Sequence, residues 1–320
     1  MDYVLGIDSG GTKFLVKAVG MDGKELAEYE GHPAGLYRFS RNEAVRTIQD
    51  NLEWCIGQAG LAKADCRAIV CGTTGIDSEE DRQEVEEIYR LLPGFSCPAL
   101  CVNDAEVALY AVTGGTGVVV ISGTGSIAFG RNGGGRTERS GGWPPCIFGD
   151  EGSGAWLNLK ALEYMSRVLD GRKERTLLYD LLNQEVGICG PKDLIRICQR
   201  IERENTGFLK LGPVVMKALR EGDENAGEIT RTEAELTFEL ADSVVQKLEI
   251  WREPEFTVGA WGSAIVKNPY HFELFKERFL EKYSNVTVTV AVRDAAYGAC
   301  RIALDILCGE TGIYRFLGFQ

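Results

Sequence analysis

The sequence predicts an α/β protein made of two lobes. Over most of the 320 residues, apolar stretches typical of buried strands alternate with stretches of helical period. A strand, a glycine-rich turn and a second strand open the chain at residues 3–20, and the same succession returns at residues 116–134. No low-complexity linker divides the chain. The repeated pattern therefore indicates two α/β lobes, each beginning with a strand–turn–strand unit.

The first third of the chain is expected to alternate strands with helices. Asp22-Gly23 is a good hairpin signal after the second strand. The spacing of Ile48, Leu52 and Ile56 is helical, and Ser78 with the acids after it is typical of a capped helix start. The predicted elements are strands at 3–8, 14–20 and 68–75, helices at 42–60 and 78–92, and a strand that runs into a helix over 99–112.

After the second strand–turn–strand unit, the chain is expected to be mainly helical. The predicted elements are a long helix from about 150 to 169, mostly helical residues from 192 to 251, a strand, glycine turn and helix start over 255–266, and a last helix at 294–307. Glycine-rich turns then follow strands at Gly10, Gly123 and Gly262. We expect these three turns to face one shared cleft.

Composition excludes several classes of function. The formal net charge of -12 makes nucleic acid or an anionic membrane surface a poor partner. The N-terminus lacks the features of a signal peptide, and no apolar stretch is long enough to span a bilayer, so a cytoplasmic protein is expected. The ten cysteines include no CxxC pair, and we interpret them as small buried thiols in a reducing cytosol. His32 and His271 are far apart in the sequence, so a histidine-based triad is not expected.

The glycine-rich turns could bind phosphate groups. Backbone amides in such turns point into a concavity and can hold phosphate oxygens. One such turn is weak evidence, because tight turns between strands also need glycine. Three turns in one chain favour a phosphate-binding function. The first of them, GIDSGGTK, lacks the spacing of a P-loop.

Three aspartates and a tryptophan lie near these turns. Asp8 could hold magnesium through water, with the magnesium bridging ATP phosphates, or could merely form a turn at a strand end. Asp104 follows a strand, where a kinase would place its catalytic base, but aspartate is also a good helix N-cap. Asp150 and Glu151 either favour the positive end of a helix or, in the case of Asp150, accept hydrogen bonds from substrate hydroxyls. Trp143 could be a ligand platform or part of a core.

Five segments in order resemble one known family. They are GIDSGGTK, VNDA, ISGTGS, GGW with GDEGSG, and VGAWGS. This order is similar to that of the N-acetylglucosamine kinase and BadF/BadG/BcrA/BcrD-type ATPase family, within the sugar kinase, heat-shock-chaperone and actin superfamily. The resemblance extends from about residue 3 to about residue 307.

The resemblance implies two ribonuclease-H-like lobes of the sugar kinase/actin type with an interlobe ATP cleft. The N-terminal lobe would comprise residues 1–113 and about 296–320, and the C-terminal lobe residues 114–295. The implied ligands are ATP, magnesium and a small-molecule sugar. Family members are often dimers, so a homodimer is among the expectations.

The resemblance also implies roles for individual residues. Asp104 would be the catalytic base, Asp8 would act through magnesium, and Asp150 would bind sugar hydroxyls. The implied ATP-binding residues are Gly10, Gly11, Thr12, Lys13, Ser122, Gly123, Thr124, Gly125, Ser126, Gly262 and Ser263. The implied substrate-binding residues are Asp104, Thr124, Gly125, Trp143 and Asp150.

The chain departs from the family pattern at two places in the acceptor pocket. The stretch GGWPPCIFGDEGS is longer than the usual turn and is stiffened by Pro144 and Pro145. An asparagine that often recognises the N-acetyl sugar in the family has no equivalent before Asn42. The expected function is transfer of the γ-phosphate of ATP to a hydroxyl of an amino sugar, N-acetylglucosamine or glucosamine.

Two other functions remain open at the level of the sequence. An ATPase activator of a 2-hydroxyacyl-CoA dehydratase would need two cysteines per subunit in glycine-rich turns to hold an iron–sulfur cluster. Cys146 is the only cysteine in a suggestive loop. A non-catalytic sugar or nucleotide sensor is the other alternative, and it would be favoured by a missing base.

Overall fold

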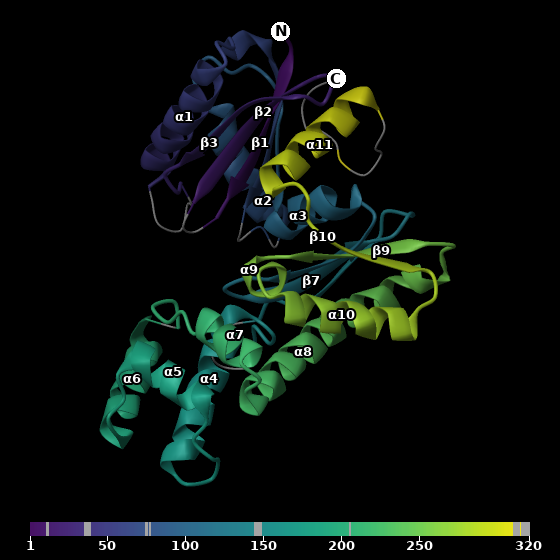
Figure 1. Ribbon diagram of the computed structural model, residues 1–320. Coiled ribbons are helices and arrows are strands. Elements are labelled where there is room, and N and C mark those ends of the chain that lie inside the picture. The colour runs from purple at the N-terminus through teal and green to yellow at the C-terminus, as the bar shows by residue number, and fades with distance from the viewer. Residues whose placement is uncertain are drawn as a thin grey trace. The chain divides into compact units, whose positions relative to one another are not determined.

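The computed structural model describes residues 1–10, 13–34, 40–73, 76, 78–143, 149–204, 206–309 and 314. The chain divides into two compact units (Figure 1). Unit 1 consists of Met1–Thr116 and Ala291–Gln320, and unit 2 consists of Gly117–Val290.

Unit 1 contains a five-stranded mixed sheet with the order β3-β2-β1-β4-β5. Its strands are β1 (Tyr3–Ser9), β2 (Phe14–Gly20), β3 (Glu25–Gly31), β4 (Cys66–Thr73) and β5 (Ala99–Asn103). The first three strands are antiparallel, whereas β4 and β5 run parallel to β1. The backbone bond from Gly23 N–H to the Gly20 carbonyl, 2.9 Å long, closes the hairpin predicted at Asp22-Gly23.

The helices of unit 1 cover both faces of this sheet. They are α1 (Arg41–Gln58), α2 (Glu79–Arg90), α3 (Asp104–Thr113) and α11 (Ala295–Cys308), with the short helix η1 (Lys63–Asp65) before β4. Alternate β1 residues such as Leu5 and Ile7 share a core with α1 and α2. The opposite face of β1 meets α11, and Gly6 is so close that a Cβ there would lie 2.1 Å from the Ala296 carbonyl oxygen. Figure 1 shows the yellow α11 beside the purple β1, from the two ends of the chain.

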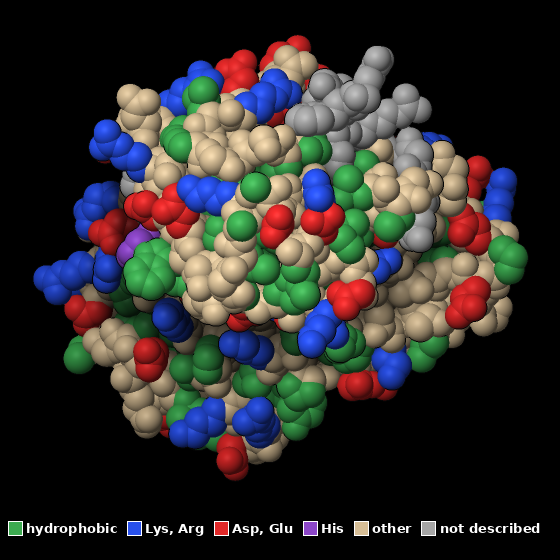
Figure 2. All heavy atoms as spheres, turned by 90° about the horizontal axis from the view of Figure 1, so that it is seen from above, with side chains coloured by type: hydrophobic (Ala, Val, Ile, Leu, Met, Phe, Trp, Pro, Cys, Tyr) green, Lys and Arg blue, Asp and Glu red, His purple; other side chains and the backbone are tan. Residues whose placement is uncertain are grey.

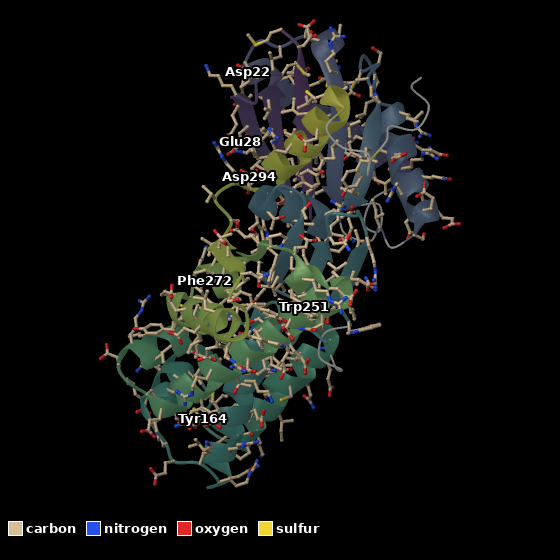
Figure 3. All side chains as sticks on the ribbon, turned by 90° about the vertical axis from the view of Figure 1, so that its right-hand side faces the viewer. Asp22, Glu28, Tyr164, Trp251, Phe272 and Asp294 are labelled. Carbon is tan, nitrogen blue, oxygen red and sulfur yellow. The ribbon has the colours of Figure 1, made fainter. Side chains whose placement is uncertain are left out.

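A buried cation joins the edge of the unit 1 sheet to the start of α11. Lys17 Nζ lies 2.9 Å from Glu25, 2.7 Å from Glu28 and 2.8 Å from Asp294, whose side chain also caps α11. Glu28 and Asp294 lie near each other at this edge (Figure 3). Burial alone would lower the pKa of Lys17, but the hydrogen bonds that its ammonium donates to the three carboxylates outweigh burial and raise it.

Unit 2 repeats the sheet topology of unit 1. Its order is β10-β9-β6-β7-β8, with β6, β7 and β8 antiparallel and β9 and β10 parallel to β6. The strands are β6 (Gly117–Ser122), β7 (Ser126–Arg131), β8 (Thr137–Gly141), β9 (Phe256–Trp261) and β10 (Val286–Val290). The repeat predicted from the two strand–turn–strand units is therefore confirmed at the level of whole sheets.

Two long helices pack on the unit 2 sheet, and four others form a layer with its own core. The sheet is covered by α8 (Glu224–Leu248) and α10 (Pro269–Lys282). The separate layer consists of α4 (Gly154–Leu169), α5 (Leu177–Val186), α6 (Pro191–Glu204) and α7 (Gly212–Arg220). Short helices η2 (Ile250–Arg252) and α9 (Ser263–Val266) flank β9. The long helical stretch predicted between the strands of this half is thus confirmed.

Some sequence-based expectations need correction. Strand β8, helix α10 and strand β10 were not among the predicted elements. In the case of β8 (TERSG), the reason is that this polar edge strand lacks an apolar run. Cys189, Cys198 and Cys308 are exposed, so the interpretation of the cysteines as buried thiols holds only for part of the set. Within the described residues, no helix is long and apolar enough to cross a membrane. Acidic and basic side chains are interspersed on the face shown in Figure 2.

Candidate active site

In unit 1, the β1–β2 hairpin places a buried carboxylate beside a lysine. Asp8 is the penultimate residue of β1, with a side chain 16% exposed, and its Oδ2 lies 3.6 Å from Lys13 Nζ. Gly10 N–H donates a 3.0 Å bond to the Lys13 carbonyl. Burial raises the pKa of Asp8, and Lys13 opposes that rise. The expected phosphate-binding residues Gly11 and Thr12 lie outside the described residues.

Asp104 stands at the carboxyl end of the parallel strand β5, as the first residue of α3. The helix N-cap is Asn103, whose side chain accepts a 3.0 Å bond from Ala105 N–H and donates a 3.1 Å bond to the Ile76 carbonyl. The capping role considered for Asp104 therefore belongs to its neighbour. Asp104 is half-buried. Ligands of α/β sheets bind at the carboxyl ends of parallel strands.

Asp8 and Asp104 come from strands of one sheet with β4 between them. The register pairs Asp8 with Gly72 and Gly72 with Val102, two residues before Asp104. Because neighbouring strands lie about 4.8 Å apart, the two backbone segments are about 10 Å apart at this edge. Both residues therefore lie at the same edge of the unit 1 sheet, at the carboxyl ends of its parallel strands.

In unit 2, the β6–β7 hairpin is bonded to the turn at residues 149–153. Ser126 N–H donates a 2.8 Å bond to Asp150 Oδ1, and Ser126 Oγ donates a 2.6 Å bond to the Glu151 carbonyl. Ser122 Oγ donates a 2.7 Å bond to the Gly152 carbonyl. Two serines at the two ends of the hairpin loop thus hold the turn that carries Asp150.

The start of α4 closes the same assembly. Ser153, fully buried, caps this helix by accepting a 3.2 Å bond from Trp156 N–H. The first two helical N–H groups, of Gly154 and Ala155, donate to the carbonyls of Gly123 and Thr124 at 2.9 and 3.1 Å. The interpretation of Asp150 as a charge that only stabilises the start of a helix is therefore incomplete, because its carboxylate accepts a hydrogen bond from the hairpin.

Backbone conformation shows how tightly this turn is built. Asp150 has a φ of +59°, a left-handed conformation that few side chains adopt. Gly125 sits against it, and a Cβ at that position would lie 2.5 Å from Asp150 Oδ1. Burial raises the pKa of Asp150, and the N–H of Ser126 opposes the rise. Strained residues of this kind concentrate at functional sites.

The third glycine turn lies against the second. Gly262 has a φ of +94°, and a Cβ there would lie 2.4 Å from the Ser122 carbonyl oxygen and 2.9 Å from Gly123 N. Ser263 begins α9 directly afterwards. The structure thus brings the turns at Gly123 and Gly262 together within unit 2, whereas the turn at Gly10 belongs to unit 1.

Trp143 is 56% exposed, so the core interpretation of this residue is wrong. The insertion with Pro144, Pro145 and Cys146, which follows Trp143 in the sequence, lies outside the described residues. The exposed indole keeps the prediction of a ligand platform open to test.

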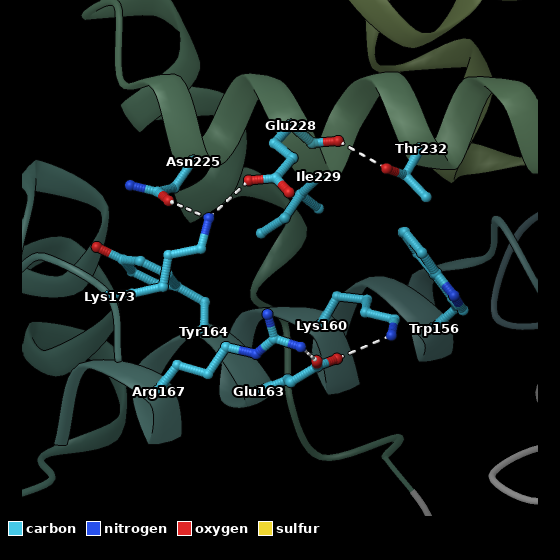
Figure 4. A pocket seen from close by; sticks show the side chains of 10 residues that line it. All are labelled: Trp156, Lys160, Glu163, Tyr164, Arg167, Lys173, Asn225, Glu228, Ile229 and Thr232. Carbon is cyan, nitrogen blue, oxygen red and sulfur yellow. Dashed lines mark hydrogen bonds and ion pairs between the residues drawn. The ribbon is translucent and has the colours of Figure 1, made fainter. Parts of the chain in front are cut away.

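A pocket of about 210 Å³ opens elsewhere in unit 2, between α4 and α8 (Figure 4). Its charges are paired among themselves. Lys160 and Arg167 both bind Glu163, at 2.8 and 2.5 Å, and Lys173 binds Glu228 at 2.9 Å. None of the residues predicted from the sequence to bind ligand lines this pocket, so it is separate from the candidate active site.

Three residues beneath the turn that carries Asp150 were not predicted from the sequence. Thr237 of α8 contacts Gly152, and it is hydrogen-bonded to His271 of α10, which faces Glu233. No local motif marks these three residues. The one signal in the sequence is that each of these polar residues interrupts the apolar face of its helix. Such interruptions are too common in helices to indicate a site.

Comparisons with known proteins point in one direction. A family model described as the BadF/BadG/BcrA/BcrD ATPase family matches residues 5–303. An N-acetylmuramic acid/N-acetylglucosamine kinase of Clostridium acetobutylicum is 34% identical over 304 residues, covering 95% of this chain and 98% of that protein. An N-acetyl-D-glucosamine kinase of Dictyostelium discoideum is 30% identical over 314 residues, with 95% and 98% covered.

A solved structure agrees with these relatives. A Chromobacterium violaceum protein described provisionally as an N-acetylglucosamine kinase has a TM-score of 0.73 and 27% identity, covering 95% of this chain and 99% of that chain. The match supports the α/β fold with two repeated sheets described above. From the match over nearly its whole length, the chain belongs to the BadF/BadG/BcrA/BcrD ATPase family.

Proposed function

We propose that this protein is an ATP-dependent kinase that transfers the γ-phosphate of ATP to a hydroxyl of an amino sugar, N-acetylglucosamine or glucosamine. The observation that carries the proposal is the bonded assembly of Asp150 with the Ser122–Ser126 hairpin loop. It places a partly buried carboxylate beside the glycine-rich loop that is proposed to bind phosphate. Relatives named as amino-sugar kinases over 95% of the chain support the same activity.

Asp150 is proposed to bind the sugar. Its Oδ1 accepts the Ser126 N–H, which orients the carboxylate. An ionised carboxylate has further lone pairs that can accept sugar hydroxyls. Thr124 and Gly125 of the neighbouring loop, together with the exposed Trp143, complete the proposed acceptor side.

Both units contribute a proposed phosphate loop. In unit 1 it comprises Gly10 to Lys13, and in unit 2 it comprises Ser122 to Ser126, with Gly262 and Ser263 proposed for the nucleotide. Lys13 is 49% exposed, so its ammonium can leave Asp8 for a phosphate oxygen at low cost. The two units are proposed to be the two lobes of the kinase, and the interlobe ATP cleft stays a prediction.

Asp8 fits a magnesium site. Burial raises its pKa, which means that its ionised form lacks stabilisation and would gain from a nearby cation. Among the described residues, no group of three or more His, Cys, Asp or Glu side chains could hold a metal ion. Asp8 would therefore share the ion with phosphate oxygens and water, as is common for magnesium. When bound, magnesium would neutralise charge on the phosphates.

Asp104 is proposed as the catalytic base. The sugar hydroxyl oxygen attacks the γ-phosphorus, the bond from that phosphorus to the bridging oxygen of ADP breaks, and Asp104 takes the hydroxyl proton. Because α3 is capped by Asn103, the position of Asp104 at the end of β5 does not depend on its own carboxylate. The remaining residues act by alignment.

The test is ATP turnover against a panel of sugars at fixed magnesium concentration. The panel contains N-acetylglucosamine, glucosamine, N-acetylmannosamine, N-acetylmuramic acid, glucose and no sugar. Turnover that depends on one amino sugar supports the proposal and names the acceptor. Equal turnover with and without sugar would contradict it, and iron analysis of the purified protein would then test the activator alternative. Gel filtration on the same sample tests the expected homodimer, and fractionation of cells tests the cytoplasmic location.

A further inference from the structure

A buried polar cluster lies on α8 and α10, next to the turn that carries Asp150. Glu233 and Thr237 are one helical turn apart on α8, and His271 lies in the first turn of α10. All three are fully buried. Among the described residues, neither carboxylate oxygen of Glu233 has a hydrogen-bond partner. Since burial of a poorly bonded carboxyl group costs free energy, the cluster needs a physical reason.

Hydrogen bonds hold the Thr237 side chain on three sides. The Thr237 hydroxyl lies 3.0 and 3.2 Å from the carbonyl oxygens of Ala234 and Glu233, to which it can donate. When it does so, its oxygen accepts from His271 Nε2, 2.9 Å away, in the tautomer that carries a proton on this nitrogen. His271 Nδ1 faces Glu233 Oε2 at 3.5 Å. Burial raises the pKa of Glu233, and the facing His271 opposes that rise.

The same threonine touches the turn. Gly152 has a φ of +73°, and a Cβ there would lie 2.6 Å from Thr237 Cγ2 and 3.0 Å from the Glu233 carbonyl oxygen. The turn therefore rests directly on α8 at this point. Ser153 N–H in turn donates a 3.1 Å bond to the Asp150 carbonyl. A displacement of Thr237 would therefore move Asp150 as well, through Gly152 and Ser153.

We propose that Glu233, His271 and Thr237 are positioning residues that hold the 149–153 turn in the geometry in which Asp150 binds the sugar. The two kinds of hydrogen bond at the Thr237 hydroxyl fix its rotamer, and the rotamer directs the methyl group to Gly152. The His271 ring faces Glu233, and the backbone N–H of His271 donates a 3.3 Å bond to the Asn268 side chain at the start of α10. This inference rests on the proposed function, because it takes the partner of Asp150 to be a sugar.

Steady-state kinetics with Thr237→Val and Thr237→Ser test the proposal. Valine keeps the shape but leaves the His271 Nε2 without its hydroxyl partner, whereas serine keeps the hydroxyl but loses the methyl group that meets Gly152. Since the proposal needs both groups, we expect the KM for sugar to rise about tenfold in Thr237→Val and at least about threefold in Thr237→Ser. The KM for ATP should stay within about twofold in both, because Thr237 contacts the sugar turn. Equal sugar KM values in both folded variants and the wild type would overturn the proposal.

Glu233 offers a matched pair of variants. In Glu233→Gln the amide can donate to His271 Nδ1, so sugar KM should stay within about twofold. In Glu233→Leu that nitrogen loses its partner, and sugar KM should rise about as much as in Thr237→Val. This pair of Glu233 variants also tests the proposal if Thr237→Val does not fold. The reverse order of the two variants would overturn the proposal.

Hydrogen exchange separates this inference from the proposed function. Without any ligand, the Ser153 amide should exchange about tenfold faster in Thr237→Val than in the wild type, while amides of β9 stay unchanged. If the wild type shows no sugar-dependent turnover, the proposed function is wrong, and this exchange measurement then decides the positioning role. Unchanged exchange at Ser153 in folded Thr237→Val would overturn that role, whatever the activity.

Discussion

The two sheets share one topology, but their first hairpins are built differently. In unit 2, three hydrogen bonds of 2.6 to 2.8 Å join the loop from Ser122 to Ser126 to the Asp150 turn: two from serine hydroxyls to backbone carbonyls, and one from a backbone N–H to the Asp150 carboxylate. In unit 1 the described contacts of the equivalent loop are one 3.0 Å backbone bond and the 3.6 Å pair of Asp8 with Lys13. The second hairpin is stabilised by hydrogen bonds within unit 2. The first hairpin holds the mostly buried Asp8 carboxylate, which a ligand would stabilise.

This difference suggests a division of labour. Hydrogen bonds within the unit 2 turn fix its geometry, including the orientation of the Asp150 carboxylate, before any ligand arrives, which suits recognition of the shape of a sugar. In unit 1, the mostly buried Asp8 carboxylate beside the half-exposed Lys13 ammonium would gain from an added cation, which suits magnesium with phosphates. Charged groups also stabilise the sheet edge of unit 1, where the Lys17 ammonium is paired with three carboxylates.

The largest effect is expected for Asp104→Asn. The amide cannot take the hydroxyl proton, so turnover should fall about a hundredfold or more while the Kd for ATP stays within about twofold. Turnover and ATP binding are measured on the same preparation, with Asp22→Asn in the exposed β2–β3 turn as the control. Near-normal turnover in Asp104→Asn would remove it as the base.

A large effect on stability is expected for Lys17→Met. Three carboxylates lose their shared cation, and since their side chains are between 31% and 55% exposed, the cost should be about 2 kcal/mol, below that of a fully buried pair. Urea unfolding measures the change. If the ion pairs of Lys17 stabilise unit 1, the loss in the free energy of unfolding should shrink at acidic pH, because the carboxylates are then protonated. A loss independent of pH would contradict the electrostatic explanation.

An intermediate effect is expected for Gly125→Ala. The added Cβ would lie 2.5 Å from Asp150 Oδ1 and must displace that carboxylate, so the sugar KM should rise about tenfold. Gly123→Ala serves as the control for thermal unfolding, because a Cβ there meets nothing within 4 Å. A sugar KM unchanged in Gly125→Ala would show that the turn is less rigid than the unit 2 hydrogen bonds imply.

The smallest effect is expected for Asp8→Asn in the absence of ligand. The pKa of Asp8 is raised by burial, so its stabilising contribution is present below the ordinary value of about 4 and is lost as pH rises through the raised pKa. At neutral pH the asparagine variant should therefore unfold a few degrees higher than the wild type, with little difference near pH 3. Scanning calorimetry at both values checks this.

The same variant should fail to gain stability from ATP with magnesium. An amide is a weaker ligand for that cation than a carboxylate, so the ligand-induced rise in melting temperature should shrink. A ligand-induced rise equal to that of the wild type would contradict the assignment of Asp8 to the cation and would weaken the contrast between the two hairpins.

Much of the fold was predictable because it depends on local patterns. The glycine turns, the hairpin at Asp22-Gly23 and the capped start of α2 at Ser78 follow from short-range preferences and were confirmed. The repeat of whole sheets followed from two strand–turn–strand units. The polar edge strand β8 was missed because its residues have no apolar period, and its pairing partner β7 alone makes it a strand.

The sequence by itself determined the residue types at the candidate site and their order along the chain, since carboxylates and glycines at strand ends are visible as motifs. Tertiary structure decided which groups share a bond. It assigned the cap of α3 to Asn103 rather than Asp104, and it joined Asp150 to Ser126. It also placed Thr237 and His271 beneath Gly152. The contacts of Asp150 with Ser126 and of Gly152 with Thr237 join residues 24 and more than 80 positions apart, so only the folding of unit 2 brings them together.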